Sequence, residues 1–268
     1  MEHKEYVLEV GSKGKARLEI LNQIFKDTSE SLLVKAGLGK GKKILEIGCG
    51  TGNMTCWLAD QVGKDGHIYA VDISAEQLEI AKKCAQVRGL TNITFIENAI
   101  IDVNSDIKFD LIYSRLVLMH ISKSYETLQH LYCMLEEGGS LICEEACNSI
   151  SCYPLCSAYL RSRDLLIQYA KLKNLDFNIG EKLYSYFNLL NLNTIFMNYI
   201  QPIYKNKQEK SMIPLFIHEA RNNYIKYGLS TTEEIDHICS EVKKYIDNEH
   251  NLISFPRIMQ IIGTKSCQ

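Results

Sequence analysis

Apolar residues recur along this chain with two different spacings, and the two spacings alternate. Short apolar runs have the length of buried strands and cover residues 44–47, 67–72, 92–97, 109–114 and 140–147. Between them, apolar residues three or four positions apart predict helices over 53–62, 74–88 and 123–135. Strands that alternate with helices favour an α/β fold with a mostly parallel sheet and helices on both of its faces.

The second half of the chain has a different rhythm. Two further strands, 192–203 and 257–263, bring the predicted sheet to seven strands. Helical spacing covers residues 150–177, 181–190, 210–227 and 231–248. Because no repeat, Pro-rich linker or low-complexity tract divides the chain, we expect one domain over residues 1–268. Its predicted parts are N-terminal helices (1–41), a core (42–149), helical insertions (150–190 and 205–250) and final strands (191–204 and 254–265).

Composition and charge indicate a soluble globular protein. Its 268 residues are 46% hydrophobic and 23% charged, which is ordinary for such a protein. The formal net charge of −2 gives no basic signal for nucleic acid. No apolar run reaches the ~20 residues of a membrane-spanning helix, and the charged start Met1–Glu5 does not resemble a secretory signal. We therefore expect a cytoplasmic monomer or homodimer without membrane or nucleic-acid partners.

Ten cysteines need an explanation. Without a secretory signal, reduced thiols are the expected state. Cys143, Cys147, Cys152 and Cys156 form a cluster in the sequence, but it contains no C-x-x-C pair of the kind that structural zinc sites use. We expect no metal site and interpret these cysteines as small apolar residues.

Candidate chemistry gathers where the first predicted strand ends. Glu46, Gly48, Gly50 and Gly52 form E-x-G-x-G-x-G, which runs from the strand into a helix. Glycines leave no Cβ where the backbone turns sharply, and they let a ligand lie against free N–H groups at the helix start. Asp72 ends the second strand about 20 residues later, where nucleotide-binding sheets hold a ribose diol. A helix cap is the alternative role for this aspartate.

Four motifs in order resemble those of class I S-adenosylmethionine-dependent methyltransferases. Glu46–Gly52 is similar to the first motif of that family, and Asp72 stands at the family's second-strand acid. Phe109–Ser114 resembles the fourth-strand motif, and Leu135–Leu141 resembles the L-x-P-G-G turn, with Glu137 in place of proline. The resemblance implies a Rossmann-like fold, S-adenosyl-L-methionine as cofactor and S-adenosyl-L-homocysteine as product.

The flanking segments resemble a subgroup of bacterial small-molecule methyltransferases. The similar segments are Tyr6–Leu8 before paired helices, Ser114–His120, Tyr227–Ser230 and Glu233-Glu234. In that subgroup, the insertions after the fifth strand form a helical cap over the acceptor pocket. The resemblance therefore implies methyl transfer to a small molecule held beneath the two helical insertions.

The resemblance also implies which residues contact the cofactor. They are Tyr6, Glu46, Gly48, Cys49, Gly50, Gly52, Asn53, Asp72, Ile73, Gln77, Asn98, Ala99, Ile100, Ser114, Arg115 and Leu116. One stretch departs from the family, which often has Gly-Asp after the third strand, where the acid contacts the adenine amino group. Here Asn98, Ala99 and Ile100 follow the strand. An amide oxygen or backbone groups would have to make that contact.

The sequence assigns no catalytic base. A sulfonium methyl is already electrophilic, so the protein mainly has to align the acceptor and exclude water. A base is needed only when the acceptor loses a proton. His120 is the candidate base, and a packing or helix-start histidine is the alternative. The candidate acceptor-binding residues are His120, Glu144, Glu145, Tyr153 and Tyr159.

Other functions remain open. A protein or RNA methyltransferase would use an open groove, and RNA would favour basic and aromatic surfaces, which the net charge does not support. A protein that binds S-adenosylmethionine without turnover is consistent with the missing adenine acid. An arsenite methyltransferase would need converging thiols, for which Cys152 and Cys156 are the candidates. A nicotinamide enzyme would use a similar glycine turn.

Overall fold

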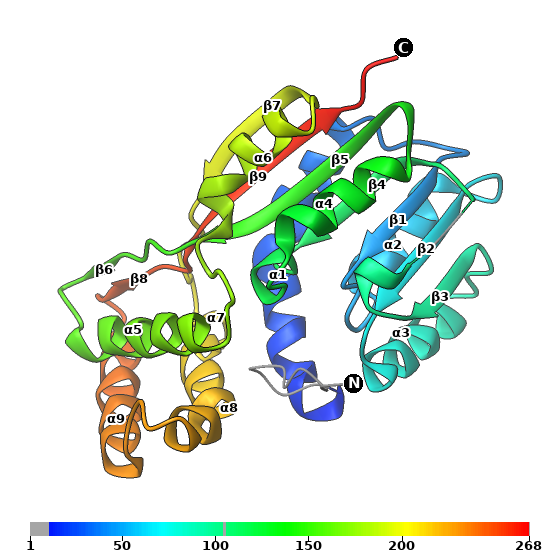
Figure 1. Ribbon diagram of the computed structural model, residues 1–268. Helices are drawn as coiled ribbons and strands as arrows, with labels where there is room; N and C mark the ends of the chain where they lie inside the picture. The colour runs from blue at the N-terminus through cyan, green and yellow to red at the C-terminus, as the bar shows by residue number, and fades with distance from the viewer. Residues whose placement is uncertain (1–10, 104–105, 268) are drawn as a thin grey trace.

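Seven strands form one sheet, with the first strand near its centre. A computed structural model describes residues 11–103 and 106–267. The strands are β1 (Lys43–Ile47), β2 (His67–Asp72), β3 (Ile93–Glu97), β4 (Phe109–Arg115), β5 (Leu135–Cys147), β7 (Asn193–Ile200) and β9 (Arg257–Thr264). Their order is β3-β2-β1-β4-β5-β9-β7 (Figure 1). The first five strands pair in parallel and β9 pairs antiparallel with both β5 and β7, so the predicted seven-stranded, mostly parallel sheet is confirmed.

Helices cover both faces of this sheet, as the alternating pattern predicts. The helices that precede or connect strands of this sheet are α1 (Gly11–Lys35), α2 (Asn53–Val62), α3 (Ala75–Val87), α4 (Ser124–Cys133) and α6 (Leu183–Leu189). Ile44 of β1 belongs to one buried cluster with Leu58 of α2, whereas the next residue, Leu45, belongs to another with Leu128 of α4. Neighbouring residues of a strand point to opposite faces, so these two clusters are the two sides of the sheet.

A second group of helices lies beyond the end of the sheet where β5 finishes (Figure 1). It consists of α5 (Ser157–Leu172), α7 (Lys207–Lys210), α8 (Met212–Lys226) and α9 (Thr232–Asp247), with the two-stranded ribbon of β6 (Cys152–Tyr153) and β8 (Leu252–Ile253). We call these segments the helical layer. Leu165 of α5 and Ile217 of α8 belong to the same buried cluster as Leu45 of the sheet. The helical layer and the sheet therefore share one hydrophobic core.

The prediction of paired helices before the first strand is wrong for the described part of that region, where α1 is one continuous helix. The apolar spacing breaks at the polar run 26–31, which suggested two segments. This run contains no Gly or Pro, and the hydroxyl of Thr28 donates to the carbonyl oxygen of Phe25 at 3.0 Å, within the helix. Polar residues on a helix face therefore interrupt the apolar pattern without interrupting the backbone.

Two predicted boundaries shift for identifiable reasons. β5 begins at Leu135, five residues earlier than predicted, because its pairing with β4 slips between Phe109 and Leu111 and so includes the expected turn. A Cβ on Gly139 would lie 2.9 Å from the carbonyl oxygen of Phe109, so this bulge needs a glycine. The helix predicted over 210–227 is divided at Ser211, because Pro214 has no N–H to donate to the carbonyl of Lys210.

The helix predicted over 181–190 also divides. Its first turn is the 3-10 helix η3 (Ile179–Lys182), and α6 follows directly. Two further 3-10 turns, η1 (Ile100–Asp102) and η2 (Leu118–His120), follow β3 and β4. In the described part of the chain, no helix combines the length and apolar character needed to cross a membrane.

Candidate active site

The carboxyl ends of three parallel strands meet at one edge of the sheet. Ile47 of β1 lies opposite Val71 of β2 on one side and opposite Ser114 of β4 on the other. The glycine loop that follows β1, residues 48–52, therefore lies between Asp72 at the end of β2 and Arg115 at the end of β4. This edge of an open α/β sheet is where such folds bind their ligands.

The glycine loop has a backbone that only glycine adopts easily. Gly48, Gly50 and Gly52 have φ values of 67°, 53° and 78°. A Cβ on Gly48 would lie 2.3 Å from Val117 Cγ2, and one on Gly52 would lie 2.7 Å from Ala81 Cβ. A Cβ on Gly50, by contrast, would meet only Leu18 Cδ1, at 3.7 Å. Two glycines thus hold the loop against its neighbours, and the middle one leaves open space above the main chain.

Asp72 fastens the glycine loop. Its Oδ2 accepts the N–H of Gly50 at 2.8 Å, and its Oδ1 accepts the N–H of Ser74 at 2.9 Å. Burial raises the pKa of Asp72, against the lowering effect of the backbone N–H groups that it accepts. A carboxylate has about four acceptor positions, so both oxygens still have capacity for the two hydroxyls of a diol. Ser74 in turn caps α3 by accepting the N–H of Gln77 at 3.3 Å.

Two side chains beside Asp72 are in unusual environments. The amide oxygen Oε1 of Gln77 is buried and has no hydrogen-bond partner among the described residues. Ile73, next to Asp72, exposes 69% of its surface despite being apolar. The buried unpaired acceptor of Gln77 indicates a ligand at this edge of the loop, because an unsatisfied buried polar atom is costly. Ile73 exposes apolar surface next to Asp72.

Glu46 lies beneath the loop rather than on its surface. Its Oε2 accepts the hydroxyl proton of Thr55 at 2.6 Å, which ties β1 to the first turn of α2. Burial raises the pKa of Glu46 to about 7, although Thr55 and the charge of Arg115 lower it. Cys49 is also buried, and Asn53 donates through Nδ2 to Thr51 Oγ1 at 3.1 Å.

The end of β4 joins the sheet to α1. Arg115 donates through Nη1 to Ser29 Oγ at 3.1 Å and through Nη2 to Asn22 Oδ1 at 3.4 Å. The next residue, Leu116, has a φ of 57°, which is uncommon for a residue with a side chain. Its N–H donates to the carbonyl oxygen of Glu144 at 2.8 Å, which holds the unusual turn in place. Such local strain is typical of binding sites.

Glu144 and Glu145 are fully buried and are occupied by protein donors. Glu144 accepts from Tyr113 Oη at 2.6 Å and from Gln260 Nε2 at 2.7 Å. Glu145 accepts from Ser114 Oγ at 3.2 Å and from the N–H groups at the start of η2, which belong to Val117, Leu118 and Met119. Their predicted contact with an acceptor stays a prediction. In this structure, both carboxylates position the neighbouring strands and η2.

The other predicted acceptor residues, His120, Tyr159 and Tyr153, have different surroundings. His120 ends η2, and its ring packs edge-on against Phe177 with 5.2 Å between the ring centroids. Burial, with the positive charge of Arg17, lowers the pKa of His120 to about 3. Tyr159 is buried and donates to the carbonyl oxygen of Ser254 at 2.7 Å. Tyr153 is 75% exposed on β6, which Figure 1 shows far from β1.

The segment that follows β3 lies beside Asp72. The N–H of Asn98 donates to the carbonyl oxygen of Asp72 at 3.2 Å, and its side-chain Nδ2 donates to the carbonyl oxygen of Asp102 at 3.2 Å. Ala99 and Ile100 begin η1. The structure thus brings this segment to the predicted edge of the site. Tyr6, the remaining predicted cofactor contact, lies outside the described residues.

The sequence does not predict the buried ion pair that lies beside His120. Arg17 Nε lies 2.8 Å from Glu219 Oε2, and the two side chains are only 5% and 4% exposed. The pair joins α1 to α8, and the charge of Arg17 acts on His120. No sequence signal identifies it, because the two residues are 202 positions apart.

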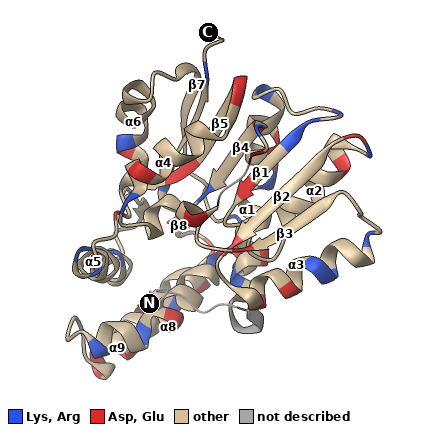
Figure 2. Ribbon diagram, turned by 45° about the vertical axis from the view of Figure 1, so that its right-hand side comes forward, with Lys and Arg blue, Asp and Glu red and all other residues tan. Residues whose placement is uncertain are grey.

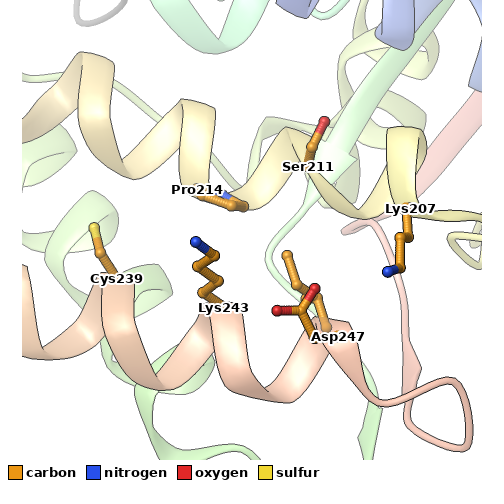
Figure 3. A pocket seen from close by; sticks show the side chains of 7 residues that line it. Lys207, Ser211, Pro214, Cys239, Lys243 and Asp247 are labelled. Atoms are coloured by element: carbon orange, nitrogen blue, oxygen red, sulfur yellow. The ribbon is translucent and has the colours of Figure 1, made fainter.

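Elsewhere in the described part of the chain, charges of both signs are interspersed and a cavity lies among the helices. Blue and red positions are interspersed along α3, α8 and α9 (Figure 2). A cavity of about 370 Å³ separates α8 from α9, and Figure 3 shows Lys207, Lys243 and Asp247 around it. It lies within the helical layer, away from the glycine loop. Among the described residues, no three His, Cys, Asp or Glu side chains converge as metal ligands would.

Comparison with known proteins identifies the class. Residues 38–212 match the family model of a methyltransferase domain, which covers well over half of the chain. The chain belongs to this methyltransferase domain family, and S-adenosyl-L-methionine is the cofactor that its class I fold uses.

Curated relatives with low sequence identity to this chain are also named as methyltransferases. The demethylmenaquinone methyltransferase of Geobacillus sp. (strain WCH70) is 28% identical over 117 residues, which is 43% of this chain and 50% of that protein. The enzyme of the same name from Symbiobacterium thermophilum is 27% identical over 157 residues, or 56% of this chain and 62% of that protein. The chain thus spans about half the length of the curated relatives it matches.

Solved structures share the fold at still lower identity. YcgJ from Bacillus subtilis has a TM-score of 0.56 at 16% identity and covers 89% of this chain and 98% of its own. The phosphoethanolamine N-methyltransferase 2 of Haemonchus contortus has a TM-score of 0.58 at 14% identity, over 96% of this chain and 58% of its own. The cyclase SpnF has a TM-score of 0.58 at 16% identity, over 99% and 86%. At these identities the likeness concerns the fold alone.

Proposed function

We propose that the protein transfers a methyl group from S-adenosyl-L-methionine to a small molecule held between the carboxyl edge of the sheet and the helical layer. The observation that carries the proposal is the 2.8 Å contact between Asp72 Oδ2 and the N–H of Gly50. It joins the glycine loop and the second-strand acid into one site of the kind that holds a nucleoside.

The residues present fit the cofactor. The glycine loop would receive its methionine part on the open main chain at Gly50, and Asp72 would accept the ribose hydroxyls. Gln77 Oε1 would find a donor there, and the exposed side chain of Ile73 would cover the adenine ring. When bound, S-adenosyl-L-methionine supplies an electrophilic methyl group. The task of the chain is then to orient the acceptor and exclude water.

His120 is better suited to line the acceptor site than to remove a proton. Because its pKa is lowered to about 3, the imidazole is neutral near pH 7 but is a weak base. We infer that His120 contributes a wall and a hydrogen bond. An acceptor that loses a proton would lose it to another group or to water.

The helical layer supplies the other wall. The buried pair Arg17–Glu219 fixes α8 to α1 beside His120. Most of α8 and all of α9 lie outside the family match, which ends at residue 212. Within the helical layer, α8 and α9 are thus the helices that the family match leaves uncovered, apart from the first residue of α8. The name of the two curated relatives, demethylmenaquinone methyltransferase, makes demethylated quinones in their reduced, quinol form a sensible first class of acceptor to test.

Binding and turnover need separate experiments, because proteins of this fold need not share a reaction. Calorimetric titration with S-adenosyl-L-homocysteine tests the cofactor site. Transfer of a labelled methyl group is then measured with demethylated quinols, a wider set of metabolites, protein extracts and RNA. The proposal expects label only on a small molecule. Label on protein or RNA, or cofactor binding without any transfer in these assays, would contradict it.

A further inference from the structure

Two cysteines from neighbouring helices bring their sulfur atoms into contact. Cys56 Sγ on α2 lies 3.5 Å from Cys84 Sγ on α3. Cys56 is fully buried, whereas Cys84 is partly exposed, and both are free thiols. Cys152 and Cys156 show a different contact, in which the N–H of Cys156 lies 3.4 Å from Cys152 Sγ. Sulfur atoms at 3.5 Å from two separate helices are close to the position that a disulfide requires.

The thiol pair is next to the glycine loop. The N–H of Cys56 donates to the carbonyl oxygen of Gly52 at 2.9 Å. Ala81, one helical turn before Cys84, is the residue that a Cβ on Gly52 would meet at 2.7 Å. The two helices are therefore joined at adjacent points by the loop contact and by the sulfur contact.

We propose that Cys56 and Cys84 form a reversible disulfide that weakens cofactor binding, which rests on the proposed function of the glycine loop. The oxidant is a hydroperoxide. The Cys84 sulfur attacks the peroxide oxygen, the O–O bond breaks, and Cys84 becomes a sulfenic acid while an alcohol or water leaves. The Cys56 sulfur then attacks the Cys84 sulfur, the S–S bond forms, and the hydroxyl of the sulfenic acid leaves with the Cys56 proton as water. Two thiols lose two hydrogens and two electrons, and a thiol reductant returns them.

The environments of the two sulfurs fix this order. The oxidant reaches Cys84 first because Cys84 is the partly exposed member of the pair. Burial, with the neighbouring Cys84 thiol, raises the pKa of Cys56 to about 12, so Cys56 stays protonated until it attacks.

The disulfide would disturb the glycine loop, because Ala81 of α3 already packs closely against Gly52. A disulfide has an S–S length of about 2.05 Å, which is shorter than the present sulfur separation of 3.5 Å. We expect part of this closure to come from rotation of the two side chains and part from an approach of α3 to α2. Ala81 already lies against Gly52, and the approach would push the loop out of its position. By thermodynamic reciprocity, bound cofactor disfavours the disulfide by the same factor by which the disulfide weakens the cofactor.

Peptide mapping tests the link without any cofactor. The full chain is treated with hydrogen peroxide, blocked, and digested with trypsin without reduction. We expect the peptide 44–64 joined to the peptide 84–88, with two hydrogens lost, and fragmentation that places the link on Cys56 rather than Cys49. Cys84→Ser removes the joined peptide, whereas the matched variant of an exposed cysteine, Cys133→Ser, keeps it. Oxidised Cys84 without a joined peptide would overturn the proposal.

Calorimetry tests the effect on the site. We expect oxidised protein to bind S-adenosyl-L-homocysteine about tenfold more weakly, and dithiothreitol to restore the affinity. Saturating S-adenosyl-L-homocysteine should make the disulfide easier to reduce by about 30 mV, which is that tenfold change for two electrons. Equal affinity of the oxidised and reduced forms overturns the control of binding even if the link forms. If the reduced protein binds no S-adenosyl-L-homocysteine, the proposed function fails, and peptide mapping still decides the link.

Discussion

Asp72 and Gly50 are joined by a 2.8 Å hydrogen bond from the glycine N–H to the carboxylate, across the gap between the ends of β2 and β1. A single acid thereby performs two tasks: it holds the glycine loop, and it presents its remaining acceptor capacity to a ligand. Because both tasks depend on one carboxylate, its removal should affect binding more than stability.

Replacing Asp72 with alanine should weaken S-adenosyl-L-homocysteine binding by about 10- to 100-fold. A hydrogen bond to a charged group contributes about 1.5–3 kcal/mol, and water replaces part of what the variant loses at the diol and at Gly50, so the net loss corresponds to about one such bond. Calorimetric titration measures the loss. Asp65→Ala, in an exposed turn, is the matched control and should bind as the wild type does. Unchanged affinity of the Asp72 variant would exclude it from the ribose contact.

Gly41 and Gly48 both have a positive φ but have different neighbours. Alanine substitutions at these two positions therefore distinguish the cost of backbone strain from the cost of a steric collision. Gly41 and Gly48 have φ values of 78° and 67°, but only Gly48 would place a Cβ against another residue, Val117. Gly41→Ala should cost about 1 kcal/mol of unfolding free energy, and Gly48→Ala about 1–3 kcal/mol more, with lost cofactor binding. Chemical denaturation of both variants measures the difference. Equal losses would mean that Val117 moves aside freely.

The buried pair Arg17–Glu219 should be costly to break from one side. Arg17→Met leaves the carboxylate of Glu219 buried without its partner in this ion pair, which should destabilise the protein by about 3–5 kcal/mol. The double variant Arg17→Met with Glu219→Met should recover part of that loss. Arg221→Ala breaks an exposed pair with Asp236 on neighbouring helices and should cost less than about 1 kcal/mol. Thermal and denaturant unfolding of these variants measures the three losses.

Stability should fall as the pH rises from about 4.5 to 7. Burial raises the pKa of both Glu46 and Glu145 from 4.5 to about 7. The folded protein binds more protons at these two groups than the unfolded chain does in this interval, and together they outweigh the single buried His120, whose pKa lowered to about 3 acts in the opposite direction. Linkage therefore makes the unfolding free energy decrease with pH. Each carboxyl contributes at most about 3 kcal/mol. Glu145→Gln should flatten the profile measured by denaturant titration. A rise in stability over the same interval would contradict the assigned shifts.

The sequence predicted the parts of this protein that depend on neighbouring residues. The first five strands, the glycine loop and Asp72 follow from local apolar runs and from glycine positions, and the register of a parallel sheet brings them together. The start of β5 was harder to predict, because its pairing with β4 includes a bulge at Gly139. Local pattern also misjudged α1, where polar residues continue a helix that the apolar spacing seemed to end.

Contacts between segments that are distant in the sequence could not be predicted from the spacing of apolar and polar residues. Arg17 meets Glu219 and Cys56 meets Cys84 only because helices pack together, and neither pair has a spacing that distinguishes it. Glu144 and Glu145 show the opposite problem. Two acids at a strand end suggest a ligand contact, but strand pairing turns one toward Gln260 and the other toward the N–H groups of η2.

The central claim is that the glycine loop and Asp72 form an S-adenosylmethionine site. The most direct test is calorimetric titration of the reduced wild-type protein with S-adenosyl-L-homocysteine, and in parallel with NAD and NADP. We predict one binding site for S-adenosyl-L-homocysteine and no heat from either dinucleotide. Binding of NAD or NADP in the absence of S-adenosyl-L-homocysteine binding would contradict the account.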